Sequence, residues 1–212
     1  MKKAIACLVV ILFQLLSALS ASADIKLPSP QTEGGMGLFE SLKKRASSPG
    51  GDFPTGALSD EELSNVLWAA TGLNRGDKGW TVPMDKGEPP YVDVYAANDK
   101  GVFMYDWSSH SLVEISKNDI RANIGLQKFV EKAPCSLIFV ADAEALSVFT
   151  NETLRAQFAD VAAGAMTQNV YLVSSALGLG ARYIHSVKDE ELKSALNLPD
   201  ENRVICLMML GK

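Results

Sequence analysis

The segment from Ala159 to Ile184 constrains the fold more than any other part of the chain, because it combines small residues, a broad apolar covering and a glycine stop. Residues 162–165 are Ala-Ala-Gly-Ala, and the apolar covering consists of Met166, Val170, Leu172, Val173, Ala176 and Leu177. A helix that is apolar on so many sides belongs inside a protein or at a subunit contact. Gly178 and Gly180 suit a helix C-terminus, where glycine adopts the left-handed backbone at little cost. The segment therefore predicts a buried central helix that leads into a strand.

The first 23 residues have the pattern of a secretory signal. A basic start, Met1-Lys2-Lys3, precedes an apolar run over residues 4–18, and Ala21-Ser22-Ala23 has the small-x-small form of a cleavage site. The apolar run is shorter than a membrane span requires, so no membrane anchor is expected. We predict a signal peptide over residues 1–23, an extended arm over 24–37 and one domain over 38–212. The mature protein is expected in the periplasm or outside the cell.

The net charge narrows the classes of partner, and the two cysteines outside the signal segment can be thiols or a disulfide. The formal net charge is −5, and losing Lys2 and Lys3 with the signal peptide makes it −7. This acidic balance argues against nucleic acid or an anionic membrane as a partner. Cys135 and Cys206 both lie in apolar, strand-like runs, so buried thiols are expected, although an oxidising compartment also allows a disulfide between them.

The rest of the chain alternates helices with strands. Ser59 and Glu62 form a capping box that opens a helix ending near Gly72. His110 sits at a hairpin turn and is expected to be exposed. Further helices are predicted over residues 38–45 and 117–131 and from a Ser186 cap, with strands over 91–97, 135–141, 181–184 and 203–210 and a hairpin over 101–115. This pattern predicts an α+β sandwich with a mostly antiparallel mixed sheet around the buried central helix.

Few side chains offer catalysis of their own. The chain has two histidines, His110 and His185, and neither a G-x-S-x-G motif nor paired His or Cys spacing for a metal. Gly178-Leu179-Gly180 resembles part of a dinucleotide fingerprint, but it closes a helix instead of opening one. The basic run over residues 43–45, followed by the hydroxyls of Ser47 and Ser48, is a candidate phosphate-binding segment. Catalytic residues stay unassigned, and no metal is expected.

Four blocks of sequence, in this order, resemble the nitroreductase family of flavin proteins. They are LFESLKKRASS, LSDEELSNVLWAATGLNR, GVFMYDWSSHSLVEI, and DVAAGAMTQNVYLVSSALGLG with its closing RVICLMMLG. The hairpin is most similar to the branch that includes peptide thiazoline oxidases and exported relatives. The resemblance implies a nitroreductase-like fold and an intertwined homodimer with two FMN sites at its interface. It also implies flavin-mediated hydride or electron transfer to a small organic acceptor, with the protein binding and orienting the flavin.

The resemblance also implies which residues contact FMN. They are Arg45, Ser47, Arg75, His185, Ser186 and Lys212, with Lys86 as a candidate substitute for a missing contact. Ala46 and Pro49 stand where the family carries basic residues, and Gly50-Gly51 is an insertion. Losing one charge-assisted contact weakens binding roughly ten- to a hundredfold. Two hypotheses follow: an FMN-dependent oxidoreductase with a weakened motif, or an exported scaffold that has lost FMN and serves as a binding or interaction protein.

Overall fold

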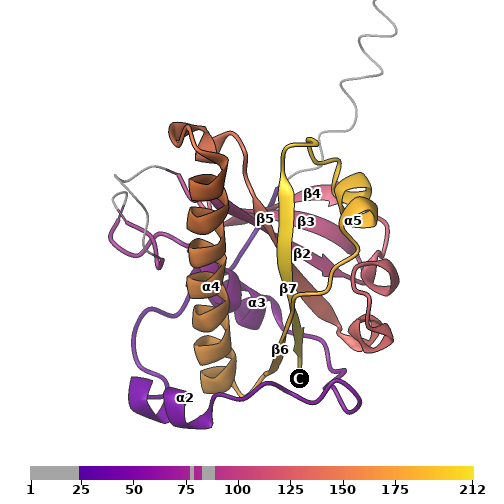
Figure 1. Cartoon of the computed structure of the whole chain (residues 1–212). Coiled ribbons are helices and arrows are strands. Elements are labelled where there is room, and N and C mark those ends of the chain that lie inside the picture. Colours follow the sequence, from indigo (N-terminus) through magenta and orange to yellow (C-terminus); the bar gives the residue numbers. More distant parts are fainter. Residues whose placement is uncertain (1–23, 77–78, 83–88) are drawn as a thin grey trace, which may run out of the picture.

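The computed structural model describes residues 24–76, 79–82 and 89–212, and its centre is a seven-stranded sheet (Figure 1). The strand order is β1-β4-β3-β2-β5-β7-β6, and every neighbouring pair is antiparallel. The strands are β1 (Ile25–Lys26), β2 (Val92–Asn98), β3 (Gly101–Asp106), β4 (Ser111–Ser116), β5 (Cys135–Ala141), β6 (Gly180–Ile184) and β7 (Arg203–Gly211). The predicted α+β class is confirmed. The predicted signal peptide and Lys86 lie outside the described residues.

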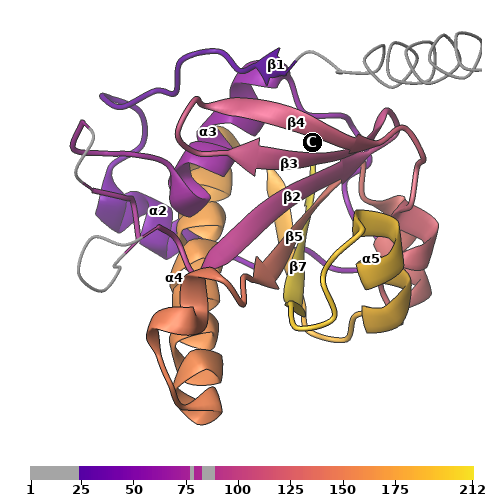
Figure 2. The ribbon, with the colours of Figure 1, turned by 90° about the horizontal axis from the view of Figure 1, so that it is seen from above.

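Helices cover both faces of this sheet. They are α2 (Leu38–Lys44), α3 (Asp60–Thr71), α4 (Glu152–Leu177) and α5 (Asp189–Leu196). Seen from above, α3 and α4 lie on one side of the sheet and α5 on the other (Figure 2). The predicted capping box of α3 is confirmed: the Glu62 N–H donates to Ser59 Oγ at 3.2 Å, and the Ser59 N–H donates to Glu62 Oε2 at 2.8 Å. Among the described residues, no helix is long and apolar enough to cross a membrane.

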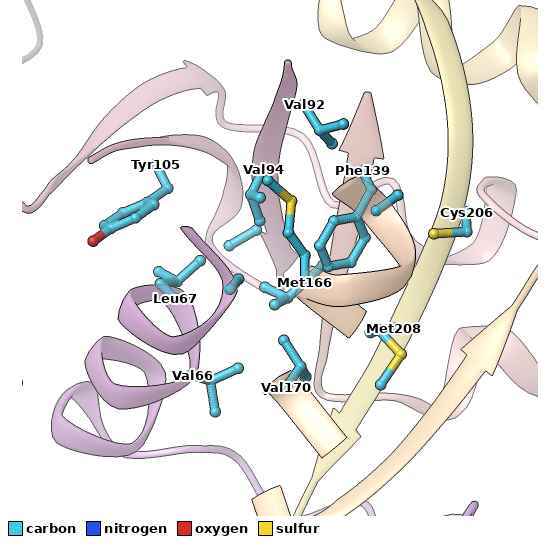
Figure 3. Close-up of a cluster of buried hydrophobic side chains, with 14 of the residues drawn as sticks. Val66, Leu67, Val92, Val94, Tyr105, Phe139, Met166, Val170, Cys206 and Met208 are labelled. Atoms are coloured by element: carbon cyan, nitrogen blue, oxygen red, sulfur yellow. The ribbon is translucent and has the colours of Figure 1, made fainter. Parts of the chain in front are cut away.

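The core is divided by the sheet into two apolar layers. Along β5, Leu137 and Phe139 face α3 and α4, whereas Ile138 and Val140 belong to the layer on the other face. This alternation is the period-two geometry of a strand buried on both sides. Figure 3 shows the first layer, where Met166 of α4 lies beside Phe139.

The central helix α4 begins earlier than predicted and buries only one face in this chain. Asn151 caps it by accepting the Leu154 N–H at 3.1 Å, and Gly178 ends it in the left-handed conformation, as predicted (φ 72°). The buried face consists of Ala159, Ala162, Ala163, Met166, Thr167, Val170, Tyr171 and Ser174. Leu154, Phe158 and Val161 stay exposed on the opposite side. The prediction that α4 is packed on most of its circumference within one chain is therefore wrong. The alternative, that its exposed side lies at a subunit contact, stays a prediction.

The predicted helix over residues 117–131 is wrong. The segment forms two short 3₁₀ turns, η1 (Arg121–Asn123) and η2 (Lys128–Lys132), separated by bends around an isolated bridge between Gly125 and Val187. Residues 124–126 pair with residues 186–188, since the Lys188 N–H donates to Ile124 O and the Leu126 N–H donates to Ser186 O, each at 3.0 Å. This tertiary pairing outweighs the helical spacing of the apolar residues. It also occupies the backbone of Ser186, and α5 begins after Lys188 without a side-chain cap, so the predicted Ser186 cap is wrong.

His110 is not the exposed turn residue that its position in the hairpin predicts. It is partly buried and has a left-handed backbone, with φ of 52°. Its Nε2 lies 2.8 Å from Ser64 Oγ and 2.9 Å from the Pro28 carbonyl oxygen, and its Nδ1 lies 2.8 Å from Tyr105 Oη. The side chain therefore ties the N-terminal arm to α3 and to the hairpin.

The two described cysteines are free, buried thiols. In the pairing of β5 with β7, Cys135 lies opposite Leu210 and Cys206 lies opposite Phe139. Four residues of strand separate the two positions, which is about 13 Å. A disulfide needs Cα atoms within about 7 Å, so this register excludes the bond. Burial raises the pKa of both thiols to about 12.

Candidate functional site: the edge of strand β6

A short extended segment, Arg45–Ser48, runs beside the outer edge of β6 and is called the strap here. β6 is the last strand of the sheet and pairs with β7 alone. The Ser48 N–H donates to the Ala181 carbonyl at 2.9 Å, and Arg182 Nη1 donates to the Ser48 carbonyl at 2.9 Å. These contacts fix the strap along the first half of β6.

Two predicted anchor residues of the strap meet at Tyr171 of α4. The Arg45 guanidinium carbon lies 5.3 Å from the centre of the Tyr171 ring, and Ser47 Oγ lies 2.7 Å from Tyr171 Oη. The same phenol oxygen accepts the backbone N–H of Tyr183 in β6 at 2.8 Å. Tyr171 is buried, whereas Ser47 is exposed and Arg45 half-buried. Tyr171 was not predicted from the sequence as a site residue, although it lies within the QNxYL pattern that carries part of the family resemblance.

Strand β6 leads from the strap to the predicted residues His185 and Ser186. His185 is exposed, and Ser186 is partly buried because its carbonyl accepts the Leu126 N–H. The five residues of β6 span about 16 Å. Ser48 of the strap pairs with Ala181 near the start of β6, and His185 follows the last residue of the strand, which suits an extended ligand with an anionic end near Arg45.

Tyr183 adds a neutral hydrogen-bonding group between these two ends. Its side chain is 39% exposed, and it shares a side-chain hydrogen bond with Cys206. Burial, reinforced by the neighbouring Cys206, raises the pKa of Tyr183 to about 12. The phenol therefore stays protonated at neutral pH. Neither Tyr183 nor Cys206 was identified from the sequence as part of a site.

The Gly50-Gly51 insertion is held away from the strap's anchor residues. A Cβ atom at Gly50 would lie 2.8 Å from the Phe129 ring, and Lys132 Nζ donates to the Gly51 carbonyl at 2.8 Å. The Arg182 guanidinium stacks on the same Phe129 ring at 5.3 Å. The insertion therefore extends the covering of the β6 edge, and the cation that the strap contributes near Tyr171 is Arg45.

The remaining predicted FMN contacts, Lys212 and Arg75, do not join Arg45 and Ser47 at Tyr171. Gly211 pairs with Gly180, which places Lys212 at the strap end of β6, but Lys212 Nζ forms an ion pair with Glu62 at 2.7 Å. The hydrogen bond from Lys212 lowers the pKa of Glu62. Arg75 is exposed beyond the opposite end of α3, a helix of about 18 Å. The structure therefore brings Arg45 and Ser47 together, places Lys212 near them in a competing ion pair, and leaves Arg75 elsewhere.

The surface formed by the strap and the outer face of β6 is open in this protomer. A hollow of 250 Å³ lies beside the strap and is lined by Lys44, Ala46, Ser48, Tyr171, Ser174, Ser175, Gly178, Leu179 and Ala181. A second hollow, of 350 Å³, lies between the N-terminal arm, α2, α3 and α4. Neither is lined by Arg45, Ser47 or His185. A ligand on these three residues would need a further covering surface.

Comparisons with known proteins identify the family. The sequence matches the Nitroreductase family over residues 52–212. It is 31% identical over 184 residues to a candidate nitroreductase of Methanocaldococcus jannaschii, covering 81% of this chain and 86% of that protein. A candidate nitroreductase structure from Ralstonia eutropha has a TM-score of 0.83 at 34% identity, covering 91% and 90% of the two chains. An FMN-dependent nitroreductase of Clostridium difficile, at 21% identity, TM-score 0.54 and coverage of 82% and 86%, shares the fold.

This chain therefore belongs to the nitroreductase family, and the predicted family is confirmed. Membership implies flavin-dependent oxidoreductase activity. The narrower resemblance to thiazoline oxidases stays a prediction. The strap lies before residues 52–212, so the family match does not cover it. Its role is therefore inferred from its contacts in the structure.

The residues along β6 fit a flavin nucleotide. Arg45 and the hydroxyl of the exposed residue Ser47 suit a phosphate, for which arginine is a preferred partner. Tyr183 and exposed His185 border the surface on which a planar ring would lie.

Proposed function

We propose that this protein is an FMN-dependent oxidoreductase that passes a hydride or electrons to a small organic acceptor. The observation that carries the proposal is the position of Arg45 and Ser47 beside β6, with exposed His185 directly after the last residue of that strand. The strap would hold the phosphate, and the backbone around His185 and Ser186 would border the ring. The flavin supplies the redox chemistry when bound, while these residues bind and orient it.

The test is the absorbance spectrum of the purified mature protein, with and without added FMN, followed by a titration of flavin fluorescence. The proposal expects a yellow protein, or quenching of FMN fluorescence with a dissociation constant near micromolar. Absence of quenching at high protein concentration would overturn it. That outcome would favour the second hypothesis, a scaffold without flavin, for which the replacement of basic residues by Ala46 and Pro49 is the supporting observation.

We propose further that two copies of the chain form a homodimer through α4 and α2. On α4, Leu154, Phe158 and Val161 follow one another at helical spacing and are 43%, 36% and 67% exposed. Leu38 and Phe39 of α2 are more than half exposed. The two sets lie toward opposite ends of α4, because α2 packs beside its C-terminal end, so the proposed contact runs along the helix. Exposed apolar side chains are typical of protein contacts. A second protomer would also supply the covering that the β6 surface lacks.

Replacing Val161 by Glu places a charge in the proposed contact. We expect the wild type to sediment as a dimer and Val161→Glu as a monomer at the same micromolar concentration. The matched control is Ile25→Glu, since Ile25 is an exposed apolar residue of β1 at the opposite edge of the sheet. A monomeric wild type, or a Val161→Glu variant that stays dimeric, contradicts this contact.

We also propose that the protein acts after export, in the periplasm or outside the cell. The basic, apolar and small-x-small pattern of residues 1–23 supports this. An exported chain takes up its cofactor after translocation, so the flavin must be available there. N-terminal sequencing of the protein recovered from its producing cells should start near Asp24, and an intact Met1 in a cytoplasmic fraction would contradict export.

A further inference from the structure

One buried phenol connects the strap to strand β6. Tyr171 is 8% exposed, and its oxygen contacts both Ser47 in the strap and the backbone N–H of Tyr183 in β6. Its ring lies under the Arg45 guanidinium. A single side chain of α4 thus touches both residues that the phosphate end requires.

The hydrogen bonds around Tyr171 have a direction. A tyrosine oxygen carries one proton to donate and accepts through its lone pairs. Because the Tyr183 N–H donates to this oxygen, the phenol proton is available for donation to Ser47 Oγ, which lies 2.7 Å away. In the arrangement in which the phenol donates, the Ser47 hydroxyl keeps its own proton for an acceptor outside the protein. Hydrogen bonds in such a chain polarise one another, so the first bond strengthens the last.

The position of Arg45 depends on the same residue. Arginine stacks on an aromatic face through its planar guanidinium while its N–H groups at the rim stay free to donate. At 5.3 Å from the ring centre, the Arg45 guanidinium lies within cation–π range of Tyr171. Tyr171 therefore presents a charged donor and a neutral donor side by side, which is the pairing that a phosphate monoester accepts.

We propose that Tyr171 is a positioning residue that orients Ser47 and Arg45 toward the phosphate of a bound flavin nucleotide, and thereby selects FMN over riboflavin. This rests on the proposed function, since it assigns a task within the same site. It assigns Tyr171 no contact with the ring and no part in the redox step. With one basic strap residue in place of several, orientation of the remaining donors decides how well the phosphate is held.

The experiment measures dissociation constants of FMN and of riboflavin for the mature protein and for Tyr171→Phe, by fluorescence quenching. The variant keeps the ring under Arg45 and removes the hydroxyl. We expect FMN binding to weaken about fivefold to tenfold, the size of one hydrogen bond, while riboflavin binding changes less than about twofold. Ser47→Ala should weaken FMN similarly, and the double variant should be little weaker than either single one, because both changes interrupt one chain of bonds.

The matched control is Tyr105→Phe, which removes another buried phenol hydroxyl, bonded to His110 at the hairpin. It should leave the ratio of FMN to riboflavin affinity unchanged. Equal weakening of both flavins by Tyr171→Phe would indicate a packing role and overturn the inference, as would an unchanged FMN affinity. If the wild type binds neither flavin, the proposed function fails, and the inference with it. If it binds both flavins equally well, only the inference fails.

Discussion

The two edges of the sheet are covered in similar ways but differ in what they leave free. At the β4 edge, the N-terminal arm supplies β1, and its hydrogen bonds meet at the His110 side chain. At the β6 edge, the strap supplies the cover, and its contacts meet at Tyr171. The first edge is closed, because Ser64 is fully buried beside His110. The second leaves Ser47 exposed.

This difference separates a structural junction from a binding surface. Edge strands carry unpaired backbone groups that proteins must cover or protect. The cover over the β4 edge uses its polar side chains on one another and on the backbone. The cover over the β6 edge includes a half-buried cation, Arg45, and an exposed hydroxyl-bearing residue, Ser47. Changes at the β6 edge should therefore alter ligand binding, and changes at the β4 edge should alter stability.

The largest expected effect is that of Arg45→Ala on flavin binding. Removing the charge-assisted contact should weaken FMN binding roughly ten- to a hundredfold, with little change in the urea midpoint. Titration of FMN fluorescence measures the first quantity and urea denaturation the second. Lys43→Ala is the matched control, because it removes the same charge from an exposed position in the last turn of α2. Equal effects of the two variants would show that general charge, and not the strap geometry, holds the ligand.

The opposite result is expected at the β4 edge. Ser64→Ala removes the hydroxyl that donates to the Pro28 carbonyl at 2.6 Å and contacts His110. Loss of a buried hydrogen-bonding group should lower the free energy of unfolding by about 1–3 kcal/mol, measured by urea denaturation, and leave FMN affinity unchanged. The control is Ser194→Ala on the exposed face of α5, which should change the free energy of unfolding by less than about 0.5 kcal/mol. A Ser64→Ala variant that loses flavin but keeps its stability would contradict the comparison.

The smallest expected effect is a dependence of stability on pH through His110. Burial lowers the pKa of His110, the Lys26 ammonium acts in the same direction, and the Pro28 carbonyl opposes both. The unfolded chain therefore takes up this proton at a higher pH than the folded one, so the contribution is complete above about pH 6.5 and is lost as the pH falls toward the folded value. Asp93, whose pKa burial and Asp142 raise to about 7, contributes the opposite sign, because its stabilisation is lost as the pH rises.

The measured quantity is thus the difference between wild type and His110→Asn in urea denaturation at pH 7.5 and at pH 5.5. Asparagine tolerates the left-handed backbone of this turn, so the variant tests the imidazole and not the turn. The stability advantage of the wild type should shrink at the lower pH. An advantage that grows on acidification would show that the folded protein prefers the charged imidazole.

Local patterns predicted the elements whose causes are local. The capping box of α3 and the left-handed Gly178 at the end of α4 depend on neighbours within a few residues, and both are confirmed. The helix predicted over residues 117–131 failed because residues 124–126 pair with a segment sixty residues away. His110 was misjudged for the same reason, since its partners Ser64 and Pro28 are distant in sequence.

The residues of the candidate site also differ in whether local sequence or tertiary contacts identify them. Arg45 and Ser47 could be named from a basic and hydroxyl-bearing run, and the family resemblance carried His185. Tyr171 could not be assigned its place, because its contact with Ser47 spans 124 residues and appears only when α4 packs against β6. Lys212 was expected at the site, but its ion pair with Glu62 arises from the meeting of the chain terminus with the start of α3.

The sequence alone determined the fold class, the family and the main helix and strand signals, because hydrophobic period, caps and glycines act over short distances. The tertiary structure decided which hydrogen-bond donors lie close together, which charged side chains already form ion pairs and which face of α4 is exposed to solvent. Those outcomes depend on side chains brought together across the sheet. The spacing of these residues along the chain does not indicate which of them come into contact.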